Sequence, residues 1–230
     1  MAPAVELRSA VALLGRFPAL AGVDLRVETG EALLVQGPNG AGKTSVLRAC
    51  AGLLAVVGGE ACVLGHDLRR DRRAVRRRVG LVGHAGFLYD DLTVADNVRF
   101  AVRASGADVA GVGPALARLD LDGRLETVLV GRLSAGQRRR VSLAVLVARR
   151  PALWLLDEPH ASLDGEGRDV VDDLVRGAVA EGATVVFASH ESDRAVNLAS
   201  RTVRMAGGRV VPDAAVEPVA TAGREAVGVA

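Results

Sequence analysis

A glycine-rich loop carries the clearest chemistry in this sequence. Its eight residues form a full match to a phosphate-binding pattern: Gly37, Pro38, Asn39, Gly40, Ala41, Gly42, Lys43 and Thr44. Glycine lets successive backbone N–H groups turn inward around a phosphate, and a following helix adds partial positive charge. In such a loop the lysine reaches the β- and γ-phosphates of a nucleotide, and the threonine hydroxyl binds Mg²⁺. We therefore predict a nucleotide site here, with Ser45 of the next helix among its binding residues.

Lysine usage supports this interpretation of the loop. Lys43 is the only lysine of the chain, and every other position of the Lys and Arg set holds arginine. A compact ammonium in a chain that otherwise uses planar guanidinium groups indicates a site where arginine does not fit. The loop also follows an apolar run at residues 32–35 and precedes a helix-like segment at residues 45–50, which is the context that the pattern requires.

A second group of candidate residues is a pair of acids that ends an apolar run at residues 152–156. A buried parallel strand delivers its last side chains to the carboxyl edge of the sheet, where ligands bind. We expect Asp157 to hold hydrated Mg²⁺ and Glu158 to position or deprotonate an attacking water. A strand that simply ends at a charged turn is the alternative, and the phosphate loop upstream disfavours it.

A third candidate is the segment Leu133-Ser134-Ala135-Gly136-Gln137, which precedes a helix-like run. Ser134 is a suitable N-cap, and Gly136 leaves the backbone open to a ligand at a helix N-terminus. This pattern predicts a second phosphate-binding corner. Ser162-Leu163-Asp164 follows the acid pair, and His190 follows an apolar run at residues 184–189.

The elements that position these residues alternate between strand and helix. Expected strands lie at residues 23–27, 31–36, 61–64, 79–82, 152–157, 184–189, 202–205 and 209–211. This alternation predicts an α/β fold with a mainly parallel central sheet, flanked by an antiparallel β-subdomain. Expected helices at residues 93–104, 114–119 and 135–149 form an inserted helical subdomain, at about 93–150. The aperiodic segment 213–230 is expected to be a disordered tail.

Composition limits the classes of partner. The 230 residues fit one domain, and a net charge of +2 with 3% aromatic residues gives no reason to expect nucleic acid as the main partner. The apolar run at residues 141–148 is too short to span a membrane, and residues 5–14 make a poor signal peptide. We expect a cytoplasmic chain without its own transmembrane segment. Cys50 and Cys62 lack metal-ligand spacing and are expected to be reduced structural thiols.

Over about residues 4–212 the order and spacing of these motifs resemble the ATP-binding subunit of an ATP-binding-cassette (ABC) transporter. The resemblance implies a P-loop NTPase of the ABC-ATPase type, with a RecA-like core and an ATP-binding domain over residues 1–212. It also implies ATP and Mg²⁺ as ligands, ATP hydrolysis, and a multi-span membrane subunit that holds the chain on the inner face of the cell membrane.

The same resemblance implies a second ATP-binding subunit, either another copy or a paralogue. In the family the two subunits meet head to tail. By resemblance, Ser134, Gly136 and Gln137 of one subunit close on the γ-phosphate held by the other. Asp164 then communicates across the dimer, and His190 contacts the γ-phosphate.

Two positions depart from the family pattern. His84 stands where the family has a glutamine that touches Mg²⁺ and water and senses the membrane subunit, and the chain's only glutamines are Gln36 and Gln137. A neutral imidazole can bind metal or water, and a structural histidine in a loop is the alternative. The position of the aromatic residue that stacks on adenine falls on Leu14. Phe17 nearby either takes that role or belongs to the core.

The narrower resemblance is to the ATPase of the heme exporter used in cytochrome c maturation. It rests on the Gly-His pair at 83–84, on the segment that begins at Leu133, and on the compact length. A soluble ABC ATPase that acts on ribosomes or nucleic acid is the competing class. Seven arginines within residues 68–78 could bind nucleic acid and would support that class. A solvated helix face is the favoured interpretation of that strip. A phosphate-loop kinase would not account for residues 134–137.

Overall fold

A six-stranded sheet forms the centre of the molecule, in a computed structural model that describes residues 2–83, 87–189 and 192–211. Its strand order is β10-β9-β3-β8-β7-β6. The strands are β3 (Ala32–Gln36), β6 (Val79–Val82), β7 (Leu153–Asp157), β8 (Thr184–Ala188), β9 (Arg201–Ala206) and β10 (Arg209–Val211). All neighbouring pairs are parallel except β9 and β10. The predicted α/β fold with a mainly parallel central sheet is confirmed.

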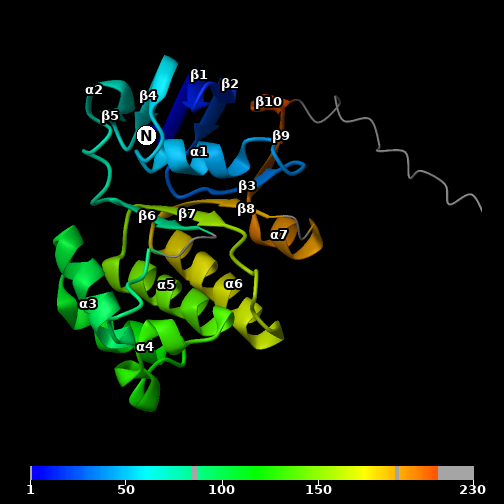
Figure 1. The fold of residues 1–230 in the computed structure, drawn as a ribbon. Helices are drawn as coiled ribbons and strands as arrows, with labels where there is room; N and C mark the ends of the chain where they lie inside the picture. The colour runs from blue at the N-terminus through cyan, green and yellow to red at the C-terminus, as the bar shows by residue number, and fades with distance from the viewer. Residues whose placement is uncertain (1, 84–86, 190–191, 212–230) are drawn as a thin grey trace, which may run out of the picture.

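A second, antiparallel sheet lies above the first in Figure 1 and has the order β2-β1-β4-β5. Its strands are β1 (Val5–Leu14), β2 (Phe17–Val27), β4 (Val56–Val63) and β5 (His66–Asp67). The sequence indicated parts of β2 and β4 but not β1. The register of β1 shifts between Leu7 and Ala10, and Ser9 there has a φ of 45°. These irregularities break the period of two by which a strand is recognised in a sequence.

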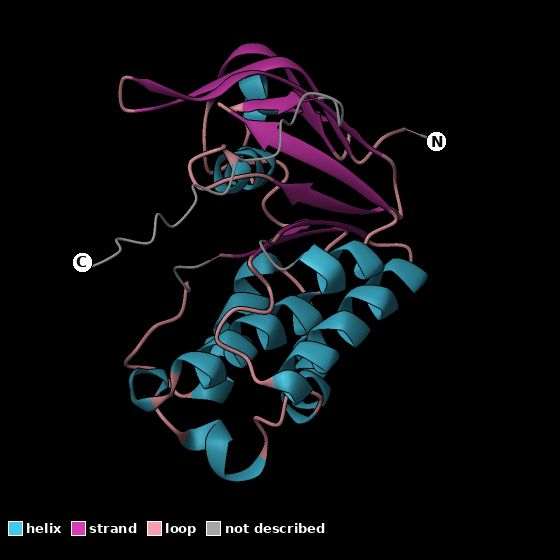
Figure 2. Ribbon diagram, turned by 90° about the vertical axis from the view of Figure 1, so that its right-hand side faces the viewer, coloured by secondary structure: helices cyan, strands magenta, loops and turns pink. Residues whose placement is uncertain are grey.

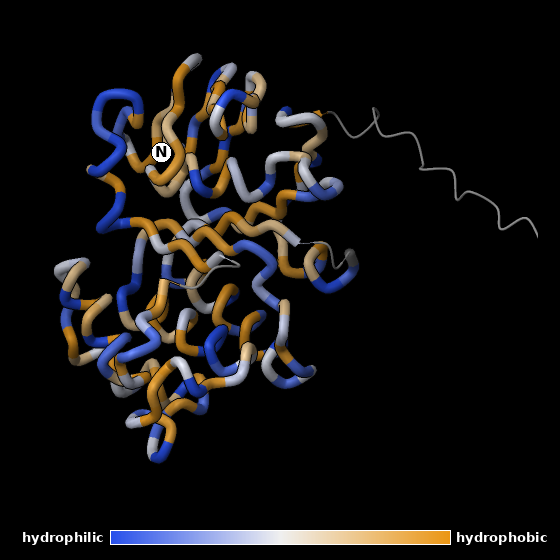
Figure 3. The backbone as a smooth tube through the Cα atoms, in the orientation of Figure 1, coloured by the Kyte–Doolittle hydropathy of each residue, from blue (hydrophilic) through white to orange (hydrophobic). Residues whose placement is uncertain are grey.

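The central strands bury both of their faces. In β7, Leu153 and Leu155 face the second sheet, whereas Trp154 and Leu156 face the helices. Strand β8 alternates in the same way. Figure 2 shows most of the helices gathered on one side of the central sheet, and Figure 3 shows the apolar central strands in orange between these helices and the second sheet.

Helix α1 (Lys43–Cys50) follows β3 and packs on the side of the second sheet. Burial raises the pKa of the Cys50 thiol to about 12, as expected for a structural cysteine. Cys50 and Cys62 are both free thiols.

The other side of the central sheet is covered by a helical segment inserted between the neighbouring strands β6 and β7. It contains α3 (Val94–Ser105), α4 (Val112–Ala117) and α5 (Ala135–Arg149), with 3-10 turns at Val109–Gly111, Gly123–Thr127 and Val130–Arg132. Helices α6 (Gly165–Ala180) and α7 (Ser192–Leu198) follow. The expected helices at 93–104 and 135–149 match closely, and α4 begins and ends two residues earlier than expected. In the described residues no helix is long and apolar enough to cross a membrane.

The arginine-rich strip differs from the expected helix. Helix α2 covers only Leu68–Asp71, capped by Asp67, and residues 72–78 are turns. Val75 is fully buried within this turn segment. The segment is therefore anchored by the burial of one apolar side chain and does not form the expected helix. The arginines of the strip are exposed, in agreement with a solvated surface.

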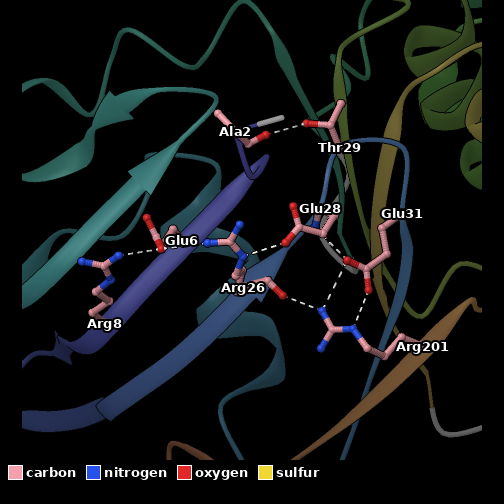
Figure 4. A network of polar contacts seen from close by, with 8 residues as sticks. All are labelled: Ala2, Glu6, Arg8, Arg26, Glu28, Thr29, Glu31 and Arg201. Carbon is pink, nitrogen blue, oxygen red and sulfur yellow. Dashed lines mark hydrogen bonds and ion pairs between the residues drawn. The ribbon is translucent and has the colours of Figure 1, made fainter.

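A polar network, shown in Figure 4, joins the two sheets. Arg201 of β9 pairs with Glu31 at 2.6 Å, and Glu31 accepts a hydrogen bond from the Glu28 backbone N–H at 2.7 Å. Arg26 of β2 contacts Glu28 at 2.6 Å and Glu6 of β1 at 3.3 Å. Since most of these groups are half exposed, each ion pair contributes little stability.

Candidate functional site

The glycine-rich loop connects β3 to α1, and its backbone conformation requires glycine at two positions. Gly37 has a φ of 146°, and a Cβ there would lie 2.2 Å from the carbonyl oxygen of Met205. Gly42 has a φ of 104°, and a Cβ there would lie 2.9 Å from the Ala19 carbonyl oxygen. Both glycines therefore permit a close approach of backbone to backbone, so that the loop packs against β9 and β2.

The ammonium group of Lys43 lies inside this loop. It donates hydrogen bonds to the carbonyl oxygens of Gly37 at 2.7 Å and Pro38 at 3.2 Å, and the residue is 7% exposed. The buried ammonium of Lys43, held by the backbone of the loop, is positioned to bind phosphate oxygens.

The first acid of the pair touches the threonine of the loop. Thr44 Oγ1 donates a hydrogen bond of 2.7 Å to Asp157 Oδ2, which joins the start of α1 to the end of β7. A hydroxyl and a carboxylate are hard oxygen donors of the kind that Mg²⁺ prefers. Among the described residues, no group of three or more His, Cys, Asp or Glu is arranged to hold a metal. This site fits Mg²⁺ bound by two protein oxygens together with the phosphates of a substrate.

The second acid, Glu158, lies in a strained turn. Its φ is 49°, a left-handed value that is costly for a residue with a Cβ. Its backbone N–H donates to the Ala188 carbonyl at 2.9 Å, which continues the pairing of β7 with β8.

A cavity of about 460 Å³ brings these residues together. Its lining consists of Leu14, Phe17, Pro18, Ala19, residues 39–45, Asp157 and Glu158. The sequence-predicted loop, metal ligand and catalytic acid therefore share one cavity. Its size suits a nucleotide, which needs apolar contact for the base and polar groups for the phosphates.

Phe17 lies at the mouth of this cavity. It pairs with Leu14 at the turn between β1 and β2, and it is 79% exposed. The interpretation of Phe17 as a core residue is therefore wrong. An exposed aromatic ring beside the phosphate loop leaves stacking on a base as its expected role.

The segment 134–137, predicted as a second phosphate-binding site, does not line the 460 Å³ cavity formed by the described residues. Ser134 is the N-cap of α5, as predicted, and it forms a capping box with Gln137. A Cβ on Gly136 would lie 2.9 Å from the Ser162 carbonyl oxygen, so close packing at this helix end also calls for glycine. Among the residues that line the 460 Å³ cavity within the described chain, none belongs to the segment 134–137.

Asp164 caps α6 by accepting a hydrogen bond from the Gly167 N–H at 2.8 Å. The two remaining candidates, His84 and His190, lie outside the described residues.

One site residue was missed by the sequence analysis. Arg139 of α5 donates hydrogen bonds to the carbonyl oxygens of Gly83 at 2.7 Å and Asp157 at 2.6 Å, and also to that of Glu158. It stands in a run of three arginines, and such a run normally marks a solvated face. Helical spacing offered a signal, because the buried Leu143 and Leu146 follow at four and seven positions and lie on the same face.

A buried histidine was also missed. His160 is 2% exposed, and its Nε2 lies 2.8 Å from Asp172 Oδ1. Because a carboxylate only accepts, Nε2 carries the proton in this contact. Asp172 Oδ2 accepts a second hydrogen bond from Arg194 at 2.9 Å. The chain His160–Asp172–Arg194 therefore ties the loop after Glu158 to α6 and α7.

Comparisons with known proteins found several similar chains. A family model described as ABC transporter matches residues 20–161. The cytochrome c biogenesis ATP-binding export protein CcmA of Xanthomonas campestris is 42% identical over 75% of this chain and 80% of its own. The sulfate/thiosulfate import ATP-binding protein CysA of Caulobacter vibrioides is 36% identical over 90% of this chain and 63% of its own.

A solved structure has the same fold. It is a dimeric ATP-binding cassette in a post-hydrolysis state, bound to ADP and Pi. It superimposes with a TM-score of 0.83 and 25% identity over 90% of this chain and 97% of its own.

The hydrogen bonds that join His160, Asp172 and Arg194 lead to a prediction about stability. Asp172→Ala leaves His160 without its partner inside the core, so we expect the free energy of unfolding to fall by about 2–4 kcal/mol. Asp169 is the matched control, because it also pairs with Arg194 but its side chain is 68% exposed. Asp169→Ala should cost less than about 1 kcal/mol. Urea denaturation of both variants measures the difference, and equal losses would contradict a buried role for Asp172.

Proposed function

Because the chain belongs to the ABC transporter family, we propose that it powers a membrane exporter that serves cytochrome c biogenesis, with heme as the expected cargo. Family membership makes the chain an ATP-binding subunit that hydrolyses ATP. Export is supported by the CcmA relative, which is more similar to this chain than the import relative is. Residues 1–212 would form the ATP-binding domain, with the helical subdomain at about 93–150.

The observation that carries the catalytic proposal is the 2.7 Å contact of Thr44 with Asp157 in a cavity that also holds Glu158. Thr44 and Asp157 would hold Mg²⁺, which when bound neutralises charge on the phosphate oxygens. Lys43 would stabilise the β- and γ-phosphates. Glu158 would orient water and accept its proton while the water oxygen bonds to the γ-phosphorus. The bond to the β–γ bridging oxygen breaks, giving ADP and phosphate.

We propose further that a second ATP-binding subunit completes each site. Ser134, Gly136 and Gln137 would close on the γ-phosphate held by the other subunit, and Asp164 would transmit the state of one site to the next. Two findings support this arrangement: these residues are not part of the described lining of their own chain's phosphate cavity, and the related cassette forms a dimer. A second copy and a paralogue both fit the partner's role.

The membrane subunit would dock at a cavity of about 340 Å³ between the central sheet and α3. Its lining includes Leu53, Phe87, Tyr89 and Phe100, which are large apolar side chains at least 44% exposed. Arg76 and Arg149 also line it, so a cytoplasmic segment with apolar and acidic side chains is the complementary occupant. This partner would hold the chain on the inner face of the cell membrane. The comparisons lend no support to a soluble ABC ATPase acting on ribosomes or nucleic acid.

Two variants separate binding from chemistry at the proposed site. Lys43→Ala should weaken ATP binding by about 100-fold, since it removes charged hydrogen bonds to the phosphates. Glu158→Gln should keep ATP binding and lower kcat by about 100-fold or more, because it removes the group that acts on water. Nucleotide titration and steady-state hydrolysis measure both effects. Unchanged turnover in Glu158→Gln would remove that residue from the mechanism.

The shared site predicts complementation between two inactive variants. Ser134→Arg should bind ATP in each subunit but block hydrolysis at the partner's site. Mixed with Lys43→Ala, it forms heterodimers with one intact site and one doubly damaged site. Hydrolysis by the mixture should therefore exceed that of either variant alone. A silent mixture, with dimers verified by light scattering, would speak against the shared arrangement.

The docking cavity predicts a defect in membrane association. Phe100→Asp places a charge in the apolar lining and should reduce the fraction of the chain that co-purifies with a multi-span membrane protein by about tenfold or more. Val109→Asp is the matched control, because Val109 is 40% exposed and is not among the described residues that line this cavity. Detergent-solubilised membranes provide the assay. Equal recovery of both variants would place the partner elsewhere, and co-purifying RNA or DNA would favour the competing class.

A further inference from the structure

The guanidinium of Arg139 contacts the backbone on both sides of the catalytic edge. Nη2 donates to the Asp157 carbonyl at 2.6 Å and to the Glu158 carbonyl, while Nη1 donates to the Gly83 carbonyl at 2.7 Å. Nε lies 3.4 Å from the Pro159 carbonyl. A single side chain of α5 therefore holds three consecutive carbonyls, beginning with the last residue of β7, and one carbonyl after β6.

These carbonyls belong to a strained part of the backbone. Glu158 and Ser162 both have left-handed φ values, 49° and 65°. A left-handed φ is costly for a residue that carries a Cβ, and it persists only where the surroundings of the residue fix it. The Glu158 N–H is held by Ala188 of β8, and its carbonyl is held by Arg139. The backbone that carries the Glu158 carboxylate is thus fixed from two sides.

We propose that Arg139 is a positioning residue for ATP hydrolysis, which holds the Glu158 backbone of its own chain so that the carboxylate meets the attacking water. This inference rests on the proposed role of Glu158. Charge-assisted hydrogen bonds to carbonyls are stronger than neutral ones, and the planar fork of arginine reaches several acceptors at once. A lysine ammonium would supply the charge without that reach.

The electrostatic surroundings keep Arg139 charged in this role. Burial lowers the pKa of its guanidinium below the ordinary value for arginine, and the negative charges of Asp157 and Glu158 oppose that shift. Since the reference value lies far above neutrality, the group remains a cation that can donate every hydrogen bond described.

The neighbouring arginine supplies a matched control. Arg138 lies on the same helix, pairs with Asp90 at 2.6 Å and donates to the Val130 carbonyl at 3.2 Å, so it contacts the helical segment instead of the catalytic edge. Arg139→Gln should lower kcat by about 100-fold and change the KM for ATP less than about threefold, because misplacement of Glu158 affects the chemical step only. Arg139→Lys should recover part of kcat. Arg138→Gln should leave both constants near wild type.

Mixtures of variants test in which chain Arg139 acts. Arg139→Gln mixed with Ser134→Arg gives a heterodimer in which one site has an intact Lys43, Glu158 and Arg139 from one chain and an intact Ser134 from the other. We expect this mixture to hydrolyse ATP as well as the Ser134→Arg and Lys43→Ala mixture does. Arg139→Gln mixed with Lys43→Ala should stay inactive, since each site then has a damaged phosphate-loop chain.

The opposite pattern would overturn the proposal. Arg139 could instead position Ser134 for the partner's phosphate. In that case the mixture of Arg139→Gln with Lys43→Ala would gain activity, and the mixture of Arg139→Gln with Ser134→Arg would not. Activity in neither mixture, with the Ser134→Arg and Lys43→Ala control active and melting temperatures unchanged, would also overturn it. A silent control would show that the shared dimer has failed, and the separation of kcat from KM in Arg139→Gln would then decide: an unchanged kcat overturns the positioning role.

Discussion

The level register of three parallel strands is the constraint on which the rest of the site depends. Val35 of β3 pairs with Ala188 of β8, and Ala188 pairs with Asp157 of β7, so the three strands end within one residue of each other. The loops that leave them must then meet at one edge, as ligand sites in such sheets do. The Thr44–Asp157 hydrogen bond is a consequence of this register. A slip of one residue in either pair would turn Asp157 to the opposite face and separate the two oxygens.

Much of this arrangement could be predicted from the sequence, because the information was local. Apolar runs bounded by glycine or acids predicted the first and last residues of β3, β7 and β8 to within one position. The parallel topology then implied that the ends of these strands lie together. The cap at Ser134 was equally local. Strand β1 was missed because its bulge near Ser9 is stabilised by pairing on both sides, with β2 and with β4, and β4 lies far along the chain.

Residues that depend on tertiary packing were harder to identify. Arg138, Arg139 and Arg140 are identical in type, yet one reaches the catalytic edge while the others pair with Asp90 and Asp120. His160 and Asp172 are twelve positions apart, and only the packing of α6 against the loop brings them together. The same limit applied to Phe17, whose exposure follows from the position of the β1–β2 turn and not from its own hydrophobicity.

The central place of β3 has a consequence for synthesis of the chain. The strand that carries the phosphate loop is paired on one side with β8 and on the other with β9, and both come from the last third of the sequence. A nascent chain therefore emerges from the ribosome with β3 and its loop early, but with both hydrogen-bonding edges open until residues 184–206 follow. During that interval the second sheet and α1 can cover only one face of β3. The strand that carries the phosphate loop thus stays open to pairing with other chains until late in translation, when β8 and β9 have been synthesised.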